Sequence, residues 1–142
     1  MPTVSATILV NKPAPEVFNF LANTANRPKF SPAIVSSSPP QMLSKGAKGT
    51  EVRKMGRRTI TSNYEVVEFE APRRFVMHFT AKGMDVTATT ESKEAAGGTQ
   101  VTVKVQLKSK GLMMWVMMPM VTPQVRKDIN EALQNTKKLL GG

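Results

Sequence analysis

The sequence predicts an α+β fold in which an antiparallel sheet packs against a long C-terminal helix. Three observations support this fold class. Segments with an apolar residue at every second position fill much of the chain, whereas the last third has apolar residues at helical spacing. The turns between the strand-like segments are short, which favours antiparallel neighbours. The chain has 142 residues, of which 40% are hydrophobic, and this is enough for one core.

The first forty residues are expected to form one strand followed by short helices. Residues 3–11 alternate between apolar and polar, as in a half-buried strand. The next apolar residues, Ala14, Val17, Phe18 and Leu21, have helical spacing. Pro15 suits the first turn of this helix, where its missing N–H needs no partner. Residues 24–30 predict a second short helix or turn, and prolines break the remainder as far as Pro40.

Five further strands are expected between residues 49 and 108. The alternating segments cover residues 49–55, 59–70, 74–81, 84–93 and 101–108. In the third of them, Phe75, Met77 and Phe79 share one face and His78 has the opposite parity. Gly97-Gly98 suits a hairpin turn because glycine adopts positive φ without a steric penalty.

The last third is predicted to be helical, but the sequence does not fix the residue at which the helix begins. Apolar or small residues recur at 3.6-residue spacing from Val125 to Leu140, and Gly141-Gly142 ends the pattern. Thr122 and Pro123 suit an N-cap and a first helical position. Residues 112–120 also favour helix, so the segment forms either one helix kinked at Pro119 or two helices separated at 119–123.

The composition argues against thiol and metal chemistry. There is no cysteine, and the single histidine, His78, cannot form a histidine cluster. No nucleophile-elbow sequence is present, so we expect no catalytic residue, no metal and no cofactor. The longest apolar run, residues 112–121, is far shorter than the roughly 20 residues that span a bilayer, and the first ten residues lack the basic start of a signal peptide. We therefore expect a cytoplasmic protein.

Several segments, taken in order, are similar to a known superfamily. They are residues 13–18 (PAPEVF), 26–32 (NRPKFSP), 64–75 (YEVVEFEAPRRF) and 98–102 (GTQVT), followed by Gly111 and the helical last third. Together they resemble the START/Bet v 1-like (SRPBCC) superfamily, in particular its polyketide cyclase/dehydrase and lipid-transport branch. The resemblance implies a single domain over residues 1–142 with a helix-grip fold. In that fold a curved antiparallel sheet of about seven strands wraps around the C-terminal helix, two short helices follow the first strand, and a cavity for an apolar molecule lies between sheet and helix.

Eleven residues are candidates for contact with such a molecule. They are Phe30, Tyr64, Val66, Phe75, Met77, Phe79, Val103, Met113, Trp115, Met117 and Met120. Tyr64 is the best polar candidate, because its hydroxyl could orient a ligand carbonyl; the alternative is an ordinary buried tyrosine. The methionines around Trp115 have three interpretations: an irregular core, an adaptable pocket wall or lid, and a patch facing a membrane or partner.

The net charge of +10 predicts an anionic partner or a solvated basic face. Cations cluster at residues 45–58, opposed there only by Glu51, and again around the methionine-rich run, where Asp128 is the only acid nearby. Stacking aromatics and nucleic-acid motifs are missing, so sequence-specific nucleic-acid binding is not expected. We expect binding or transport of a hydrophobic small molecule, lipid-like or polycyclic. The alternatives are a cyclase/dehydratase enzyme and an interaction protein at a ribosome or anionic membrane, since the resemblance includes coenzyme Q chaperones and toxin-like relatives.

Overall fold

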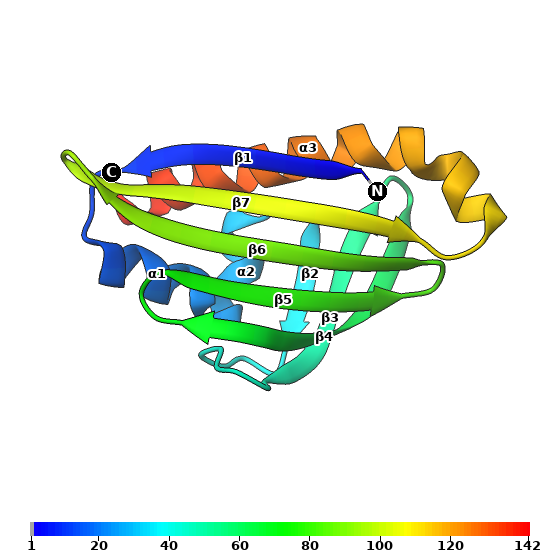
Figure 1. Cartoon of the computed structure of the whole chain (residues 1–142), viewed down its shortest axis with the longest axis horizontal. Helices are drawn as coiled ribbons and strands as arrows, with labels where there is room; N and C mark the ends of the chain where they lie inside the picture. The colour runs from blue at the N-terminus through cyan, green and yellow to red at the C-terminus, as the bar shows by residue number, and fades with distance from the viewer. Residues whose placement is uncertain (1) are drawn as a thin grey trace.

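The computed structural model describes residues 2–142 as one curved antiparallel sheet with helices on its concave side (Figure 1). The strands are β1 (Thr3–Val10), β2 (Ile34–Ser38), β3 (Lys48–Met55), β4 (Arg58–Glu70), β5 (Arg74–Ala81), β6 (Met84–Ala95) and β7 (Gly98–Ser109). The helices are α1 (Ala14–Ala22), the 3-10 turn η1 (Thr24–Asn26), α2 (Arg27–Phe30) and α3 (Leu112–Leu140). The predicted helix-grip fold is confirmed.

The order of the strands explains the curvature and the role of the short helices. Strands β2 to β7 follow one another as hairpin neighbours, and β1 closes the series beside β7, giving the order β1-β7-β6-β5-β4-β3-β2. The chain must therefore cross from one sheet edge to the other between β1 and β2, and α1, η1 and α2 make that crossing. Helix α3 runs alongside β1 and covers the concave face of the sheet (Figure 1).

The short helices close one end of the core. The ring of Phe18 on α1 meets Phe69 and Phe75 edge to face, with centroids 5.4 and 5.5 Å apart. Aromatic pairs in this arrangement add to the stabilisation that burial alone provides. Asn135 on α3 donates to the carbonyl oxygen of Phe30 at 3.1 Å, so α2 is fixed to the C-terminal helix.

Strand β2 lies in the segment before Pro40, where the prolines predict irregular structure. Strand β2 pairs with β3 at the sheet edge and ends directly before Pro39. Proline is tolerated there because an edge strand needs only one row of ladder hydrogen bonds. Ile34 and Ser37 are its buried positions, and Ile34 contributes a side chain to the cavity described below.

Helix α3 begins ten residues before the N-cap predicted at Thr122, which is a correction. The Thr122 hydroxyl donates backward to the Met118 carbonyl at 2.9 Å instead of capping the following turn. Pro119 and Pro123 lie on the exposed side of the helix, so the carbonyls left without an N–H partner face solvent. The alternative of one bent helix is the correct one, and Figure 1 shows its first turns angled away from the remainder.

Candidate functional site

A largely apolar cavity of about 180 Å³ lies between the concave face of the sheet and α3. Its walls are the inward side chains of the central strands and the inner face of α3, including Phe75, Met77, Phe79, Val86, Val103, Leu107, Val121, Val125 and Ile129. Register aligns these residues in rows, because Phe79 pairs with Val86 and Val86 with Leu107. An engineered cavity of about 150 Å³ with similar walls stays dry and binds benzene. The space therefore suits a compact ligand of one or two rings.

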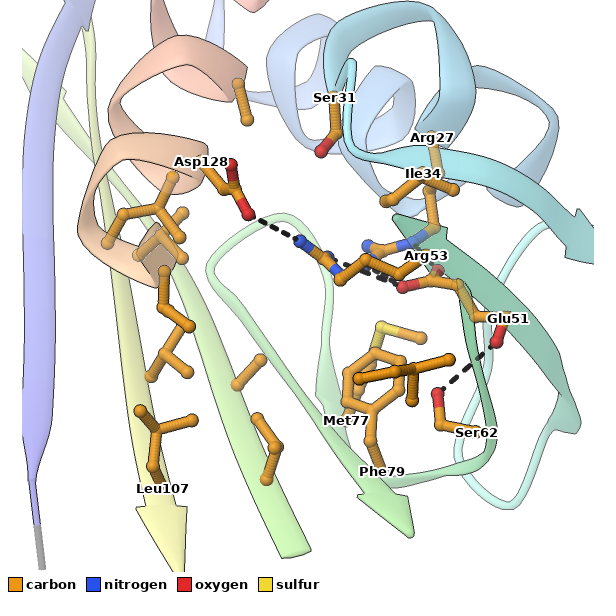
Figure 2. A pocket seen from close by; sticks show the side chains of 18 of the residues that line it. Arg27, Ser31, Ile34, Glu51, Arg53, Ser62, Met77, Phe79, Leu107 and Asp128 are labelled. Atoms are coloured by element: carbon orange, nitrogen blue, oxygen red, sulfur yellow. Dashed lines mark hydrogen bonds and ion pairs between the residues drawn. The ribbon is translucent and has the colours of Figure 1, made fainter. Parts of the chain in front are cut away.

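A chain of charged side chains crosses one end of this cavity. The Arg27 guanidinium donates from Nε to Glu51 Oε2 at 2.6 Å and from Nη2 to Oε1 at 3.3 Å. Arg53 lies 3.6 Å from Glu51 Oε1 on one side and 3.6 Å from Asp128 Oδ2 on the other. Figure 2 shows Arg53 reaching from the β3 side towards Asp128 on α3. Two cations and two carboxylates thus form a polar group, neutral in sum, within an apolar wall.

Strand and helix geometry explain why these charges point inward. In β3 the inward positions are held by Glu51, Arg53 and Met55, whereas Val52 takes the outward parity. On α3, Asp128 lies three residues after Val125 and one before Ile129, both of which line the cavity. This spacing places the carboxylate within the buried stripe of the helix.

The two carboxyl groups have opposite electrostatic environments. Burial alone would raise the pKa of Glu51, but the Arg27 charge and hydrogen bond, together with Arg53, outweigh it and hold the pKa below its ordinary value. Burial raises the pKa of Asp128, and the hydrogen bond from Gln124 and the charge of Arg53 offset this only in part. The difference follows from geometry, since Glu51 accepts two guanidinium hydrogen bonds, one of them short, and Asp128 accepts none.

One carboxylate oxygen of Asp128 is free to accept a hydrogen bond. Asp128 is only 5% exposed, and Gln124 Nε2 donates to Oδ1 at 2.9 Å. Oδ2 is buried and has no hydrogen-bond donor among the described residues, because Arg53 approaches it only to 3.6 Å. A buried acceptor without a partner is costly, so the site favours a molecule that donates to Oδ2.

Comparisons with known proteins place the chain in a family. The family model for polyketide cyclase/dehydrase and lipid transport matches residues 1–141. The chain belongs to this family. That assignment confirms the resemblance seen in the sequence, whereas no curated protein matches the chain.

Solved structures with low sequence identity share the fold of this family member. Protein TTHA0849 from Thermus thermophilus has a TM-score of 0.82 at 11% identity, over 96% of this chain and 95% of that one. Ara h 8.0201 has a TM-score of 0.72 at 15% identity, over 99% of both chains. DynU16, a protein of the dynemicin biosynthetic locus, has a TM-score of 0.69 at 15% identity, over 98% of this chain and 47% of that one.

The eleven predicted ligand contacts fall into three groups in this family member. Phe30, Phe75, Met77, Phe79 and Val103 line the cavity. Tyr64 and Val66 belong to the buried core beside it and do not line it. The remaining four, Met113, Trp115, Met117 and Met120, are exposed on the outer side of α3.

Tyr64 points inward, as its strand parity predicts, but it lies beside the cavity and does not line it. The ring extends over Gly49 of β3, and its hydroxyl accepts a hydrogen bond from Gln41 Nε2 at 3.0 Å. A Cβ atom at Gly49 would collide with this ring. Tyr64 is thus the ordinary buried tyrosine of the alternative interpretation.

The charged residues of the site are not among the sequence candidates. The sequence groups Arg53 with the basic cluster at 45–58, and the structure corrects this by placing it against Glu51 and Asp128 inside the cavity. A signal is present in the sequence, because Glu51 and Arg53 share parity with Met55, and Asp128 interrupts an apolar helical stripe. Arg27 has no such signal, because it lies on a four-residue helix without periodicity.

Other groups with reactive side chains lie outside the cavity. His78 lies on the other face of β5, as its parity predicts, with Nδ1 3.4 Å from the Thr87 hydroxyl. Residues 2–142 contain no group of three His, Cys, Asp or Glu side chains arranged to hold a metal ion. Within the same residues, no helix is long and apolar enough to cross a bilayer.

Proposed function

We propose that this protein binds a compact, mainly apolar molecule that carries one hydroxyl-type group, with that group directed at Arg53 and Asp128. The observation that carries the proposal is the Asp128 Oδ2 atom, a buried acceptor without a donor in an otherwise apolar wall. A hydroxyl can donate to Oδ2 and accept from the Arg53 guanidinium at the same time. This deepens the expectation of a hydrophobic small molecule that the family membership supports.

The charge balance favours a neutral ligand over an anionic one. The four ionised groups of the site, Arg27, Glu51, Arg53 and Asp128, sum to zero. A carboxylate ligand would bring a third negative charge within reach of Asp128, and the like charges would repel each other. A neutral alcohol or phenol avoids this repulsion and still pairs with both groups.

Three naphthalene probes test this proposal by isothermal titration calorimetry. We expect 2-naphthol to bind more tightly than naphthalene by about tenfold, the value of one hydrogen bond to a charged group. The anion 2-naphthoate should bind more weakly than 2-naphthol. Native mass spectrometry of gently purified protein should also show one apolar ligand per chain.

A matched pair of variants separates the site from general charge effects. Asp128→Asn should abolish the preference for 2-naphthol, whereas Glu131→Gln, on the same helix but more exposed, should keep it. Equal affinities for 2-naphthol and naphthalene, or equal behaviour of the two variants, would show that Asp128 does not select the ligand.

A second candidate is a cyclase/dehydratase-type enzyme, and the raised pKa of Asp128 favours it. A buried carboxyl whose pKa is raised holds its proton more readily than a free one, and it can act as a general acid beside a bound carbonyl or hydroxyl. The walls of the cavity would hold the substrate in a reactive conformation. Asp128→Asn would then keep affinity for a poly-β-ketone substrate analogue and lose its turnover, whereas a pure binding protein has no turnover to lose.

A further inference from the structure

The first turns of α3 expose apolar side chains where a surface helix normally carries polar ones. Met113 is 79% exposed, Met120 76% and Trp115 66%, and Leu112, Val116 and Met117 are also exposed. We name these six residues the α3 apolar face. Residues 111–125 contain no charged side chain at all. A helix that packs on a sheet with one side should be polar on the other, and this one is not.

The segment is nevertheless a packed part of the molecule. Met118 and Val121, on the inner side of the same turns, are buried in a cluster with Met84, Val105 and Leu107 of the sheet. Met114 contacts the β5–β6 turn and lines the cavity. Because the inner side is fixed in this way, the α3 apolar face is held outward and is accessible in the folded chain.

Exposed cations gather at the end of the sheet where α3 begins, whereas at the other end Arg73 and Arg74 pair with the glutamates. Strand pairing places the turns at Arg57, Lys82 and Lys110 at the end of the sheet where α3 begins. Lys82, Arg57, Arg58 and Lys108 are exposed there. The exposed carboxylates Glu68, Glu70, Glu91 and Glu94 lie near the opposite ends of their strands. The one partly exposed acid near the α3 end, Asp85, is paired with Lys110 at 3.1 Å.

We infer that the α3 apolar face docks on an anionic membrane surface, with Trp115 and the methionines in the interface and the surrounding cations at the headgroups. A lipid surface satisfies both features, since it accepts apolar side chains and attracts basic ones by about 1 kcal/mol each. A second copy of this chain would oppose the same cations to one another. Nucleic acid would satisfy the charge but leave the apolar side chains in water. The inference does not depend on what the cavity holds.

Trp115 reports on this docking directly, because it is the only tryptophan in the chain. The free protein should emit as an exposed tryptophan. Vesicles of phosphatidylglycerol and phosphatidylcholine should shift the emission to the blue, pure phosphatidylcholine vesicles should not, and high salt should weaken the binding. A free protein whose emission is already blue and insensitive to vesicles would overturn the inference.

Two pairs of variants test the apolar and the basic contributions. Met113→Gln with Met120→Gln should weaken partitioning to anionic vesicles by at least about tenfold. Met42→Gln, which alters an exposed methionine outside α3, should not. The double variant Arg57→Gln/Arg58→Gln should reduce both vesicle binding and its salt dependence. The control Lys137→Gln/Lys138→Gln, at the far end of α3, should change them less. Equal effects within either pair would contradict a specific docking face.

Further measurements distinguish a membrane from a second copy of the chain or a ribosome as the partner of this face. They also distinguish docking from ligand binding in the cavity. Sedimentation equilibrium that shows a dimer dissociated by the two methionine substitutions, without vesicle binding, would assign the face to a second copy and refute the membrane. Cosedimentation with ribosomes but not with anionic vesicles would also refute it. The methionine variants should retain affinity for 2-naphthol, so a failure of docking and a failure of cavity binding give different results.

Discussion

At the scale of single residues, Glu51 is the side chain on which the polar end of the cavity depends. Its carboxylate is 2% exposed and lies between the guanidinium groups of Arg27 and Arg53. Two charges buried together repay their desolvation only while both are present. Loss of Glu51 would leave two neighbouring cations without the carboxylate that they share.

Glu51→Gln should therefore destabilise the protein by about 3–5 kcal/mol, as expected when one partner of a buried ion pair is removed. Urea unfolding measures this change, and Glu65→Gln, in an exposed position on β4, provides the control. The folded pKa of Glu51 is lowered, so its stabilising contribution is present above the ordinary value of 4.5 and is lost as the pH falls through the folded value. The stability difference between Glu51→Gln and wild type should shrink in that acidic range. A constant difference would show that the loss is one of packing and not of charge.

Single residues also show where the sequence limits a site prediction. Parity correctly assigns Phe75, Met77, Phe79 and Val103 to the inward face, because strand alternation is a local property. It also places Tyr64 inward, but it does not show that the ring leans over Gly49 of a neighbouring strand and so lies beside the cavity. The pairing of Arg27 with Glu51 joins residues 24 positions apart, and no local pattern records it.

At the scale of elements, α3 has two halves with different tasks. Its C-terminal half supplies Leu133 and Thr136 to the core, and Asn135 fixes α2 through the Phe30 carbonyl. Its N-terminal half carries the α3 apolar face, and both halves contribute side chains to the wall of the cavity. The periodicity from Val125 onward predicts the C-terminal half, whereas prolines obscure its continuity with the N-terminal half. The propensity of proline to end helices yields here to tertiary packing of Met118 and Val121.

Truncation before Thr122 should leave a chain without a cooperative thermal transition. It removes the helix that covers the concave face, and the apolar inner faces of β5, β6 and β7 would be exposed to water. Circular dichroism during heating measures this. Removal of only Gly141 and Gly142, which follow the helix, is the control and should lower the midpoint by a few degrees at most, since it removes a helix cap. A cooperative transition in the long truncation would show that the sheet does not need α3.

At the scale of the whole molecule, the cavity is too small for a large lipid or polycycle unless its walls separate. A volume of about 180 Å³ lies below the roughly 300–1,000 Å³ typical of ligand pockets. The contact between Met114 on α3 and Gly83 in the β5–β6 turn closes one side of the cavity beside exposed Lys82. Opening this contact would move the first turns of α3 and enlarge the cavity without disturbing the C-terminal half of the helix.

A disulfide across this contact tests whether ligands enter there. A Cβ atom at Gly83 would lie 3.7 Å from the Met114 Cβ, within the roughly 3.5–4.5 Å range of natural disulfides, and the chain has no other cysteine to interfere. Oxidised Gly83→Cys/Met114→Cys protein should exchange 2-naphthol more slowly than the reduced form in stopped-flow measurements, and reductant should restore the rate. Gly83 has a φ of +82°, so Gly83→Ala is needed to separate the backbone strain from the cross-link. If the oxidised protein exchanges ligand as fast as the reduced one, the entrance lies elsewhere, and the first turns of α3 serve as a fixed wall.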